Sequence, residues 1–123
     1  PGGSSMPLVP KSVCDTLLMD FDALTEAQSS LGTAAIIVMD QSTDIIKAIA
    51  RIAYFYKHES CGQCTPCRTG CSKAVELMQQ DVWDQSLLTD LCDVMQDASI
   101  CGLGQAAPNP IRLTMKHFAD EIS

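Results

Sequence analysis

The clearest hydrophobic periodicity lies in the last two-thirds of the chain. Between residues 44 and 56, apolar residues recur every three or four positions, which is typical of an amphipathic helix. Ser42 and Thr43 precede the pattern as candidate hydroxyl caps, and Lys57 and His58 follow it, as the helix dipole favours. The positions expected to face inward are Ile45, Ile46, Ile49, Ile52, Ala53 and Tyr56.

Three further helices are predicted after the first. One begins at Pro66, a favoured first-turn residue, and runs to about Gln80. Another covers Asp84 to about Ala98, and the last follows Pro110. In the helix at 84–98 the residues expected to face inward are Leu87, Leu88, Leu91, Val94 and Met95. In the helix after Pro110 they are Ile111, Met115, Phe118 and Ile122. Short helices with brief connections predict a four-helix bundle.

The first forty residues follow a different pattern. Residues 1–10 are rich in Pro, Gly and Ser and predict turns. Residues 11–24 predict a short helix followed by a loop, and Thr33 to Met39 is a β-branched apolar run of strand length. Because a lone strand is not stable, its partner strands must come from another chain or from sequence outside these residues. The predicted fold class is therefore α+β, with a boundary near residues 40–44.

Composition and charge exclude several function classes. The chain has 123 residues, 19% of them charged, and a net charge of −7. Nucleic acid would be repelled on average, and no apolar stretch approaches the roughly 20 residues of a membrane span. With two His residues, no G-x-S-x-G and no glycine-rich phosphate loop, neither hydrolysis nor nucleotide binding is expected of this chain.

Seven cysteines carry the chemistry. Cys61, Cys64 and Cys67 follow one another with two residues between neighbours, a spacing at which three thiolates can bind three corners of one iron–sulfur cube. Cys101 is the best candidate for the fourth corner, because it lies in a second glycine-rich segment, Ser99–Gly104. The helix pair between the two segments would bring them together at one end of the bundle.

Neighbouring residues are expected to tune such a cluster. Cys67 falls in the first turn of a predicted helix, whose positive end stabilises thiolates. Gly62 and Gly102 allow backbone amides to approach the sulfurs, Arg68 adds positive charge, and Gln63 lies between two ligands.

Other uses of the cysteines fit less well. Structural zinc usually takes two cysteine pairs, whereas this pattern is three plus one. Three cysteines on one loop do not form disulfides readily, and a thiol-redox motif would need a βαβ context. Cys14 and Cys92 are expected to fill the core, Cys71 to be a non-ligand, and His58 to compensate a helix dipole.

Four segments carry a family resemblance: Pro1–Ser5, Lys11–Leu24, Leu31–Asp40 and Lys57–Arg68. They resemble the family of the NADH-binding flavoprotein subunit of respiratory complex I, most closely in its mitochondrial form. The resemblance implies that residues 1–42 are the latter part of a β-grasp module and residues 43–123 a four-helix [4Fe–4S] domain. It also implies that Cys61, Cys64, Cys67 and Cys101 are the cluster ligands.

The resemblance has consequences for function and partners. The family's FMN- and NADH-binding portion lies upstream and has no counterpart here, so both cofactors are expected on a companion chain. The implied role is an electron relay from reduced FMN through the [4Fe–4S] cluster to neighbouring iron–sulfur subunits and ubiquinone. Its implied place is the matrix side of the mitochondrial inner membrane.

The tail after Cys101 departs from the family pattern. Gln105–Pro110 replaces an acidic residue and a tryptophan-containing turn, and the Cys67–Cys101 interval is shorter than usual. Two alternatives therefore stay open. One is a structural or assembly module of complex I without electron transfer, and the other is the equivalent module of a flavin-dependent hydrogenase or formate dehydrogenase.

Overall fold

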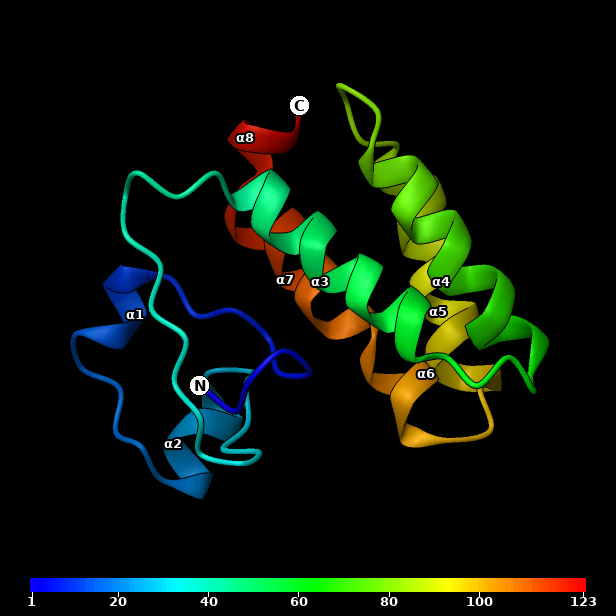
Figure 1. The fold of residues 1–123 in the computed structure, drawn as a ribbon. Coiled ribbons are helices and arrows are strands. Elements are labelled where there is room, and N and C mark those ends of the chain that lie inside the picture. Colours follow the sequence, from blue (N-terminus) through cyan, green and yellow to red (C-terminus); the bar gives the residue numbers. More distant parts are fainter.

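The computed structural model describes residues 1–123 and contains eight helices and no strand. Two short helices lie in the N-terminal third, and the other six follow residue 44 (Figure 1). The helices are α1 (Lys11–Cys14), α2 (Phe21–Glu26), α3 (Ile45–Glu59), α4 (Thr65–Met78), α5 (Gln85–Ala98), α6 (Gly102–Ala106), α7 (Pro108–His117) and α8 (Ala119–Ile122). None of them has both the length and the apolar character needed to cross a membrane.

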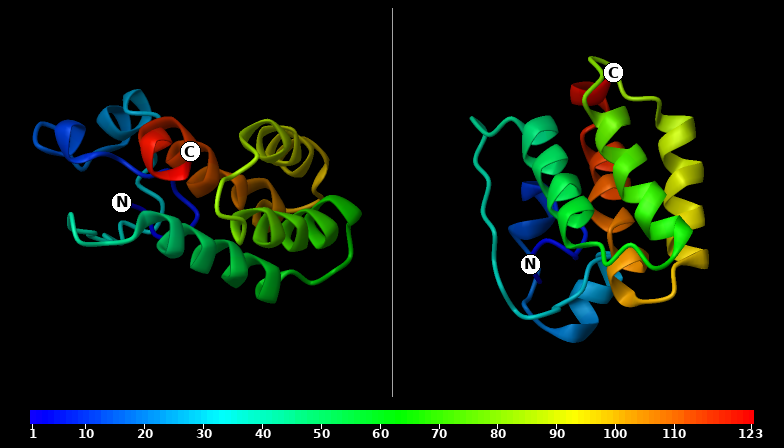
Figure 2. Two further views of the ribbon diagram at one scale, coloured as in Figure 1. Left: turned by 90° about the horizontal axis from the view of Figure 1, so that it is seen from above. Right: turned by 45° about the vertical axis from the view of Figure 1, so that its right-hand side comes forward.

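The predicted four-helix bundle is confirmed. Helix α3 packs on α4, α4 on α5, α5 on α7, and α7 returns to α3. The right-hand view of Figure 2 shows these helices side by side. Helix α6, expected to be a loop, is a short turn of helix that connects α5 to α7.

Aspartate side chains begin two of the four long helices. The carboxylate of Asp44 accepts a hydrogen bond from the amide of Lys47 at 3.0 Å, and that of Asp84 accepts one from the amide of Leu87 at 3.0 Å. The expected hydroxyl cap of α3 is wrong, since Ser42 and Thr43 instead donate to the carboxylate of Asp40. The cap is therefore one residue further along, at Asp44.

Two apolar clusters hold the bundle together. The larger one fills the middle of the bundle and consists of Ile45, Ile49, Ala53, Ala74, Val75, Leu77, Met78, Trp83, Leu88, Cys92, Ile111 and Ile122. The smaller one lies near the cysteine segments and consists of Tyr56, Cys67, Cys71, Met95 and Ala107. The inward face predicted for α3 is buried or half-buried throughout. On α5 the predicted stripe is too wide, because Leu87 and Val94 are exposed.

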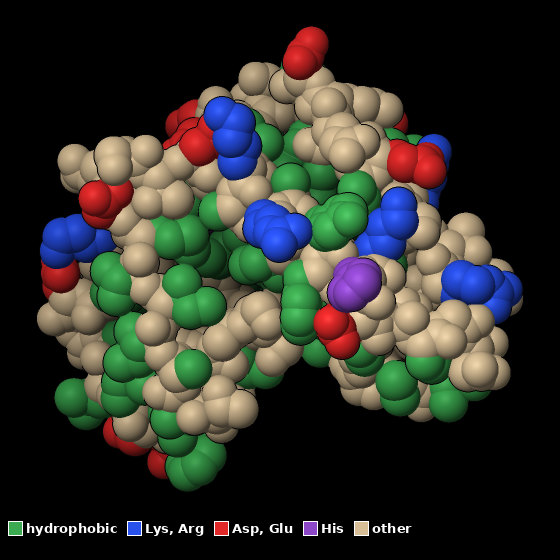
Figure 3. Space-filling model, viewed as in Figure 1, with side chains coloured by type: hydrophobic (Ala, Val, Ile, Leu, Met, Phe, Trp, Pro, Cys, Tyr) green, Lys and Arg blue, Asp and Glu red, His purple; other side chains and the backbone are tan.

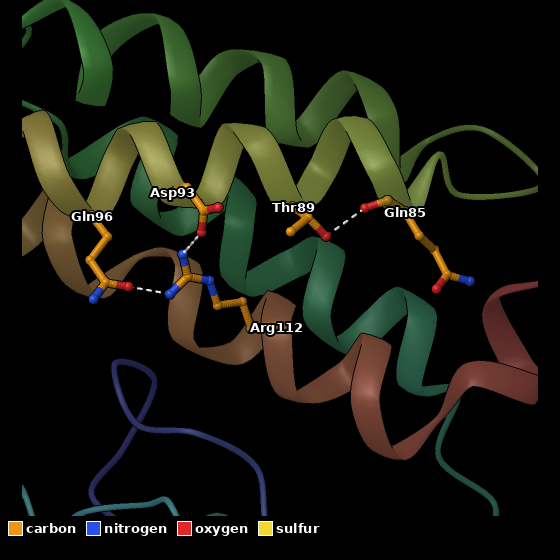
Figure 4. Close-up of polar contacts among 5 residues, drawn as sticks. All are labelled: Gln85, Thr89, Asp93, Gln96 and Arg112. Carbon is orange, nitrogen blue, oxygen red and sulfur yellow. Dashed lines mark hydrogen bonds and ion pairs between the residues drawn. The ribbon is translucent and has the colours of Figure 1, made fainter.

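Polar contacts add to the packing of α5 against α7. The guanidinium of Arg112 on α7 donates to the carboxylate of Asp93 and to the side-chain oxygen of Gln96, both on α5 (Figure 4). On α5 itself, the hydroxyl of Thr89 donates to the backbone oxygen of Gln85 at 2.7 Å. Arg112 thus fixes the rotation of α7 at its contact with α5.

The N-terminal region corrects part of the predicted fold class. Residues 33–39 form no strand, and Ile36, Ile37 and Val38 are largely exposed. The reason is physical: a strand needs neighbouring strands to pair its backbone, and this chain contains none. Hydrophobic side chains consequently gather on the surface of this region (Figure 3). The structure is helical, and the β part of the predicted α+β class is not formed.

Residues 11–24 also differ from the prediction. They form two short helices instead of one, and the apolar side chains of Leu18 and Phe21 are exposed. Cys14 is exposed and not in the core, whereas Cys92 is buried as expected. Of the large apolar side chains in this region, Leu24 is the one that is fully buried.

A few hydrogen bonds hold the N-terminal region together and attach it to the bundle. Within the region, the amide of Gly2 donates to the carbonyl of Ala35 at 2.6 Å. Across to the bundle, the side-chain amide of Asn109 donates to the carbonyl of Ser5 at 2.9 Å, and the ammonium of Lys116 donates to the side chain of Gln28. Leu8 and Met39 also pack against the larger apolar cluster, so the region is attached by both polar and apolar contacts.

Candidate metal centre

The two cysteine segments lie at the same end of the bundle. Cys61 and Cys64 are in the α3–α4 connection, and Cys67 is in the first turn of α4. Cys101 immediately precedes α6, which packs against both α4 and α5. In Figure 1 the α3–α4 loop and the turn before α6 both lie at the lower right, at the same end of the helical bundle.

Cys64 is where the two segments meet. The backbone amides of Ile100 and Cys67 face its sulfur and hold the pKa of the thiol below its ordinary value. Ile100 and Ser99 directly precede Cys101, so the second segment reaches the first through Cys64. A lowered pKa favours the thiolate, which is the form that binds metal.

Cys67 is buried behind Cys64. Its sulfur lies 3.3 Å from the hydroxyl oxygen of Ser60 and 3.9 Å from the sulfur of Cys71. A Cβ added to Gly104 would fall 2.9 Å from the Cβ of Cys67, closer than real Cβ contacts. Gly104 is thus required for α6 to approach Cys67. The glycine-rich composition of 99–104 indicated a loop and gave no sign of this contact.

The cysteine loop is braced by Arg68. Its guanidinium donates to the carbonyl of Gly62 at 2.6 Å and to the hydroxyl of Thr65 at 3.3 Å. Gly62 has a φ of +75°, a left-handed conformation that favours glycine. Arg68 therefore fixes the shape of the loop in addition to bringing positive charge.

The remaining predicted site residues have simpler surroundings. Gln63 and Gly102 are exposed, and no atom lies within 4 Å of the position that a Cβ on Gly102 would take. Cys61 and Cys101 are exposed, Cys64 is half-buried and Cys67 is buried. The site thus has a buried side at Cys67 and an open side at Cys61 and Cys101.

In two other cysteines the pKa of the thiol is raised instead of lowered. Burial raises the pKa of Cys71 to about 12, with nearby Cys67 adding to the rise. Burial also raises the pKa of Cys92 to about 11. Both thiols are neutral at physiological pH, which separates them chemically from Cys64.

Comparison with known families decides where this chain belongs. Residues 47–123 match the family model described as the NADH-ubiquinone oxidoreductase-F iron-sulfur binding region. The chain belongs to this family. The resemblance found in the cysteine loop and its flanks is thereby confirmed.

Curated members of the family are similar over nearly the whole chain. The mitochondrial 51 kDa subunit of NADH-ubiquinone oxidoreductase from Aspergillus niger is 51% identical over 99% of this chain, and an NADH-quinone oxidoreductase subunit of Rickettsia bellii is 54% identical over 99%. The chain spans 26% and 31% of the lengths of these two relatives. Among solved structures, an NAD+-reducing [NiFe]-hydrogenase chain superposes with a TM-score of 0.80 at 26% identity, covering 98% of this chain and 21% of that one.

The residues present fit the iron–sulfur group of this family. Thiolates are the usual ligands of iron–sulfur clusters, and two cysteine segments meet at Cys64. The hydroxyl of Ser99, beside them, is buried without a hydrogen-bond partner in the chain. No three His, Cys, Asp or Glu side chains are close enough together to hold a single metal ion. The sulfur donors come from two segments, the first with Cys61, Cys64 and Cys67 and the second with Cys101.

Proposed function

We propose that this chain is an electron-relay segment of an NADH:ubiquinone oxidoreductase and carries one [4Fe–4S] cluster. The observation that carries the proposal is the close approach of the two cysteine segments, where a Cβ on Gly104 would fall 2.9 Å from the Cβ of Cys67, within the iron–sulfur binding region of the family. When bound, the cluster supplies one-electron chemistry. The chain's own residues hold it in position and set its surroundings.

The proposed ligands are Cys61, Cys64, Cys67 and Cys101. Three observations support this set. Cys64 favours the thiolate form, Gly104 lets α6 approach Cys67 closely, and Arg68 braces the loop between the first three cysteines. Cys71 stays outside the set because it lies buried one helical turn after Cys67 and the two segments already give four ligands.

The proposed electron path begins outside these residues. FMN and NADH are bound by a companion chain or by protein beyond the stretch described here, and reduced FMN passes single electrons to the cluster. Neighbouring iron–sulfur subunits then accept them and deliver them to ubiquinone, on the matrix side of the mitochondrial inner membrane. The names of the curated relatives support this path. The exposure of Cys61 and Cys101 supports electron transfer at that surface.

Residues 1–42 are proposed to be the latter part of a β-grasp module, and residues 43–123 the cluster domain. The support is the apolar stretch Ile36–Val38, which has strand-like composition and lies exposed. Strands of a complete module would cover it and pair its backbone.

A second candidate is the equivalent module of an NAD+-reducing hydrogenase. The structural similarity at a TM-score of 0.80 favours it, although the sequence identity is only 26%. Identities of 51% and 54% to the oxidoreductase subunits make complex I the better supported assignment. Identification of the proteins that co-purify with this chain separates the two.

The decisive experiment compares two cysteine variants in the purified assembly. Cys101→Ser removes a proposed ligand, and Cys92→Ser is the matched control, since Cys92 is buried in the core away from the cysteine segments. After reduction with NADH under anaerobic conditions, we expect paramagnetic resonance to show one iron–sulfur signal missing from Cys101→Ser and present in Cys92→Ser. An unaltered set of signals in Cys101→Ser would contradict the ligand assignment.

NADH oxidation in the same variants tests the electron-transfer role. Cys101→Ser should assemble and lose NADH:ubiquinone turnover, whereas Cys92→Ser should keep it. Full turnover in a Cys101→Ser assembly that lacks the signal would favour a structural role for the domain.

A further inference from the structure

One buried hydroxyl in this chain has no partner. Ser99 is 5% exposed, and its Oγ forms no hydrogen bond within the protein. Its backbone groups are both satisfied: the amide donates to the carbonyl of Met95 at 3.2 Å, and the carbonyl accepts from the side-chain amide of Gln105 at 3.0 Å. The side chain is therefore anchored in place while its own hydroxyl stays unpaired, which is unfavourable in a protein interior.

The surroundings of this hydroxyl point to the cysteine site. A Cβ on Gly104 would lie 2.4 Å from the Ser99 Oγ and 2.9 Å from the Cβ of Cys67, so Ser99 and Cys67 meet at the same side of Gly104. Ile100, the next residue along the chain, directs its backbone amide at the sulfur of Cys64. The unpaired hydroxyl thus lies beside Cys67, one of the proposed ligands, where the two cysteine segments meet.

Other hydroxyl and thiol groups near the site already have contacts. The Ser60 hydroxyl oxygen lies 3.3 Å from the sulfur of Cys67 and accepts a hydrogen bond from the amide of Gly62. The thiol of Cys71 lies 3.9 Å from the sulfur of Cys67. Ser99 is different because alanine would pack in its place without leaving an unpaired polar group. Its hydroxyl is explained by an acceptor that lies outside the chain.

On the basis of the proposed function, we propose that the Ser99 hydroxyl donates a hydrogen bond to the sulfur atoms of the bound cluster on its Cys64–Cys67 side and raises its reduction potential. Thiolate and sulfide sulfurs are acceptors for such a donor. A hydrogen bond to these sulfurs stabilises the more negative, reduced cluster more than the oxidised one. The midpoint potential therefore rises.

The test is a redox titration of the cluster, followed by paramagnetic resonance, in the intact assembly. Ser99→Ala removes the hydroxyl, and Ser99→Thr keeps it. Thr114→Val is the matched control, because Thr114 is fully buried and its hydroxyl donates to the carbonyl of Pro110 at 2.7 Å, outside the cysteine segments. We expect a lower midpoint potential in Ser99→Ala only.

Each outcome decides the proposal. A Ser99→Ala cluster that keeps the potential of the unsubstituted protein, or an equal shift in Thr114→Val, overturns it. Loss of the cluster in Ser99→Ala while Ser99→Thr retains it supports the hydroxyl contact, because alanine is smaller and introduces no clash. Loss of the cluster in both Ser99→Ala and Ser99→Thr overturns the proposal, because it would show that the site needs the packing of serine and not its hydroxyl. Absence of any cluster in the unsubstituted protein contradicts the proposed function instead, so the two failures are distinguishable.

Discussion

The N-terminal third and the helical bundle are both rich in apolar residues, yet they bury them very differently. After residue 44, each long helix contributes buried side chains to the two apolar clusters of the bundle. In the N-terminal third, Leu24 is the one large apolar side chain that is fully buried, while Ile36, Ile37 and Val38 face outward. The difference shows that apolar composition gives a core only where the packing partners are present in the same chain.

The cysteine site follows the same rule. Its position depends on α4 and α6, which pack against each other within the bundle, so the bundle alone can place it. A strand, by contrast, depends on neighbours for its backbone hydrogen bonds. The part of this protein that carries chemistry is the part that contains its own packing partners.

The largest expected effect is on the free energy of unfolding, and it distinguishes a core side chain from an exposed one. Leu88→Ala removes a fully buried side chain and should lower the free energy of unfolding by about 2–5 kcal/mol. Val38→Ala removes one that is 84% exposed and should change it by less than about 0.5 kcal/mol. Urea unfolding followed by circular dichroism measures both. Similar losses of unfolding free energy in the two variants would show that residues 33–39 are packed in the native protein. That result would contradict the contrast between the N-terminal third and the bundle.

The next largest effect is on stability, and it distinguishes the two glycines of the second cysteine segment. Gly104→Ala should destabilise the protein by about 1–3 kcal/mol, because its Cβ would collide with Ser99 and Cys67. Gly102→Ala meets no atom within 4 Å and serves as the control in the same unfolding measurement. Equal stability of the two variants would mean that α6 does not approach Cys67 as closely as the structure has it.

A smaller effect is expected at Cys71. Cys71→Ala should retain the full iron content of the assembly, because the thiol, with a pKa of about 12, is neutral and is not a proposed ligand. Cys67→Ala, one helical turn away, should lose the iron of the cluster held by this chain, about four atoms. Elemental analysis of both variants decides the point, and iron loss in Cys71→Ala would make this residue a ligand.

The smallest effect concerns pH, at the end of α7 next to the contact with the N-terminal region. Burial, followed by the charge of Lys116, lowers the pKa of His117 below its usual 6.5. The unfolded chain therefore binds a proton at higher pH than the folded chain, so stability should decrease as pH falls below about 6.5. Unfolding at pH 7 and pH 5.5 measures the decrease, and His117→Gln should reduce it. The same pH dependence in that variant would assign the effect to another group.

Much of the bundle and its chemistry could be predicted from the sequence. Helical periodicity placed α3 and α5 to within a few residues, Pro66 marked the start of α4, and the spacing of Cys61, Cys64 and Cys67 indicated the cluster. The strand predicted at 33–39 does not form, because a strand needs neighbouring strands to pair its backbone and an apolar run alone does not supply them. Helix α6 and the role of Gly104 were missed, since they follow from a close approach of segments far apart in sequence.

The most direct test of the account is Mössbauer spectroscopy, together with iron and sulfide analysis, on the anaerobically purified assembly and on its Cys101→Ser variant. We predict that the variant lacks about four iron atoms and a [4Fe–4S] spectrum that the unsubstituted assembly has. Identical spectra and iron contents in the two, or a single zinc ion bound by the cysteines of this chain, would contradict the claim that both cysteine segments hold one cluster.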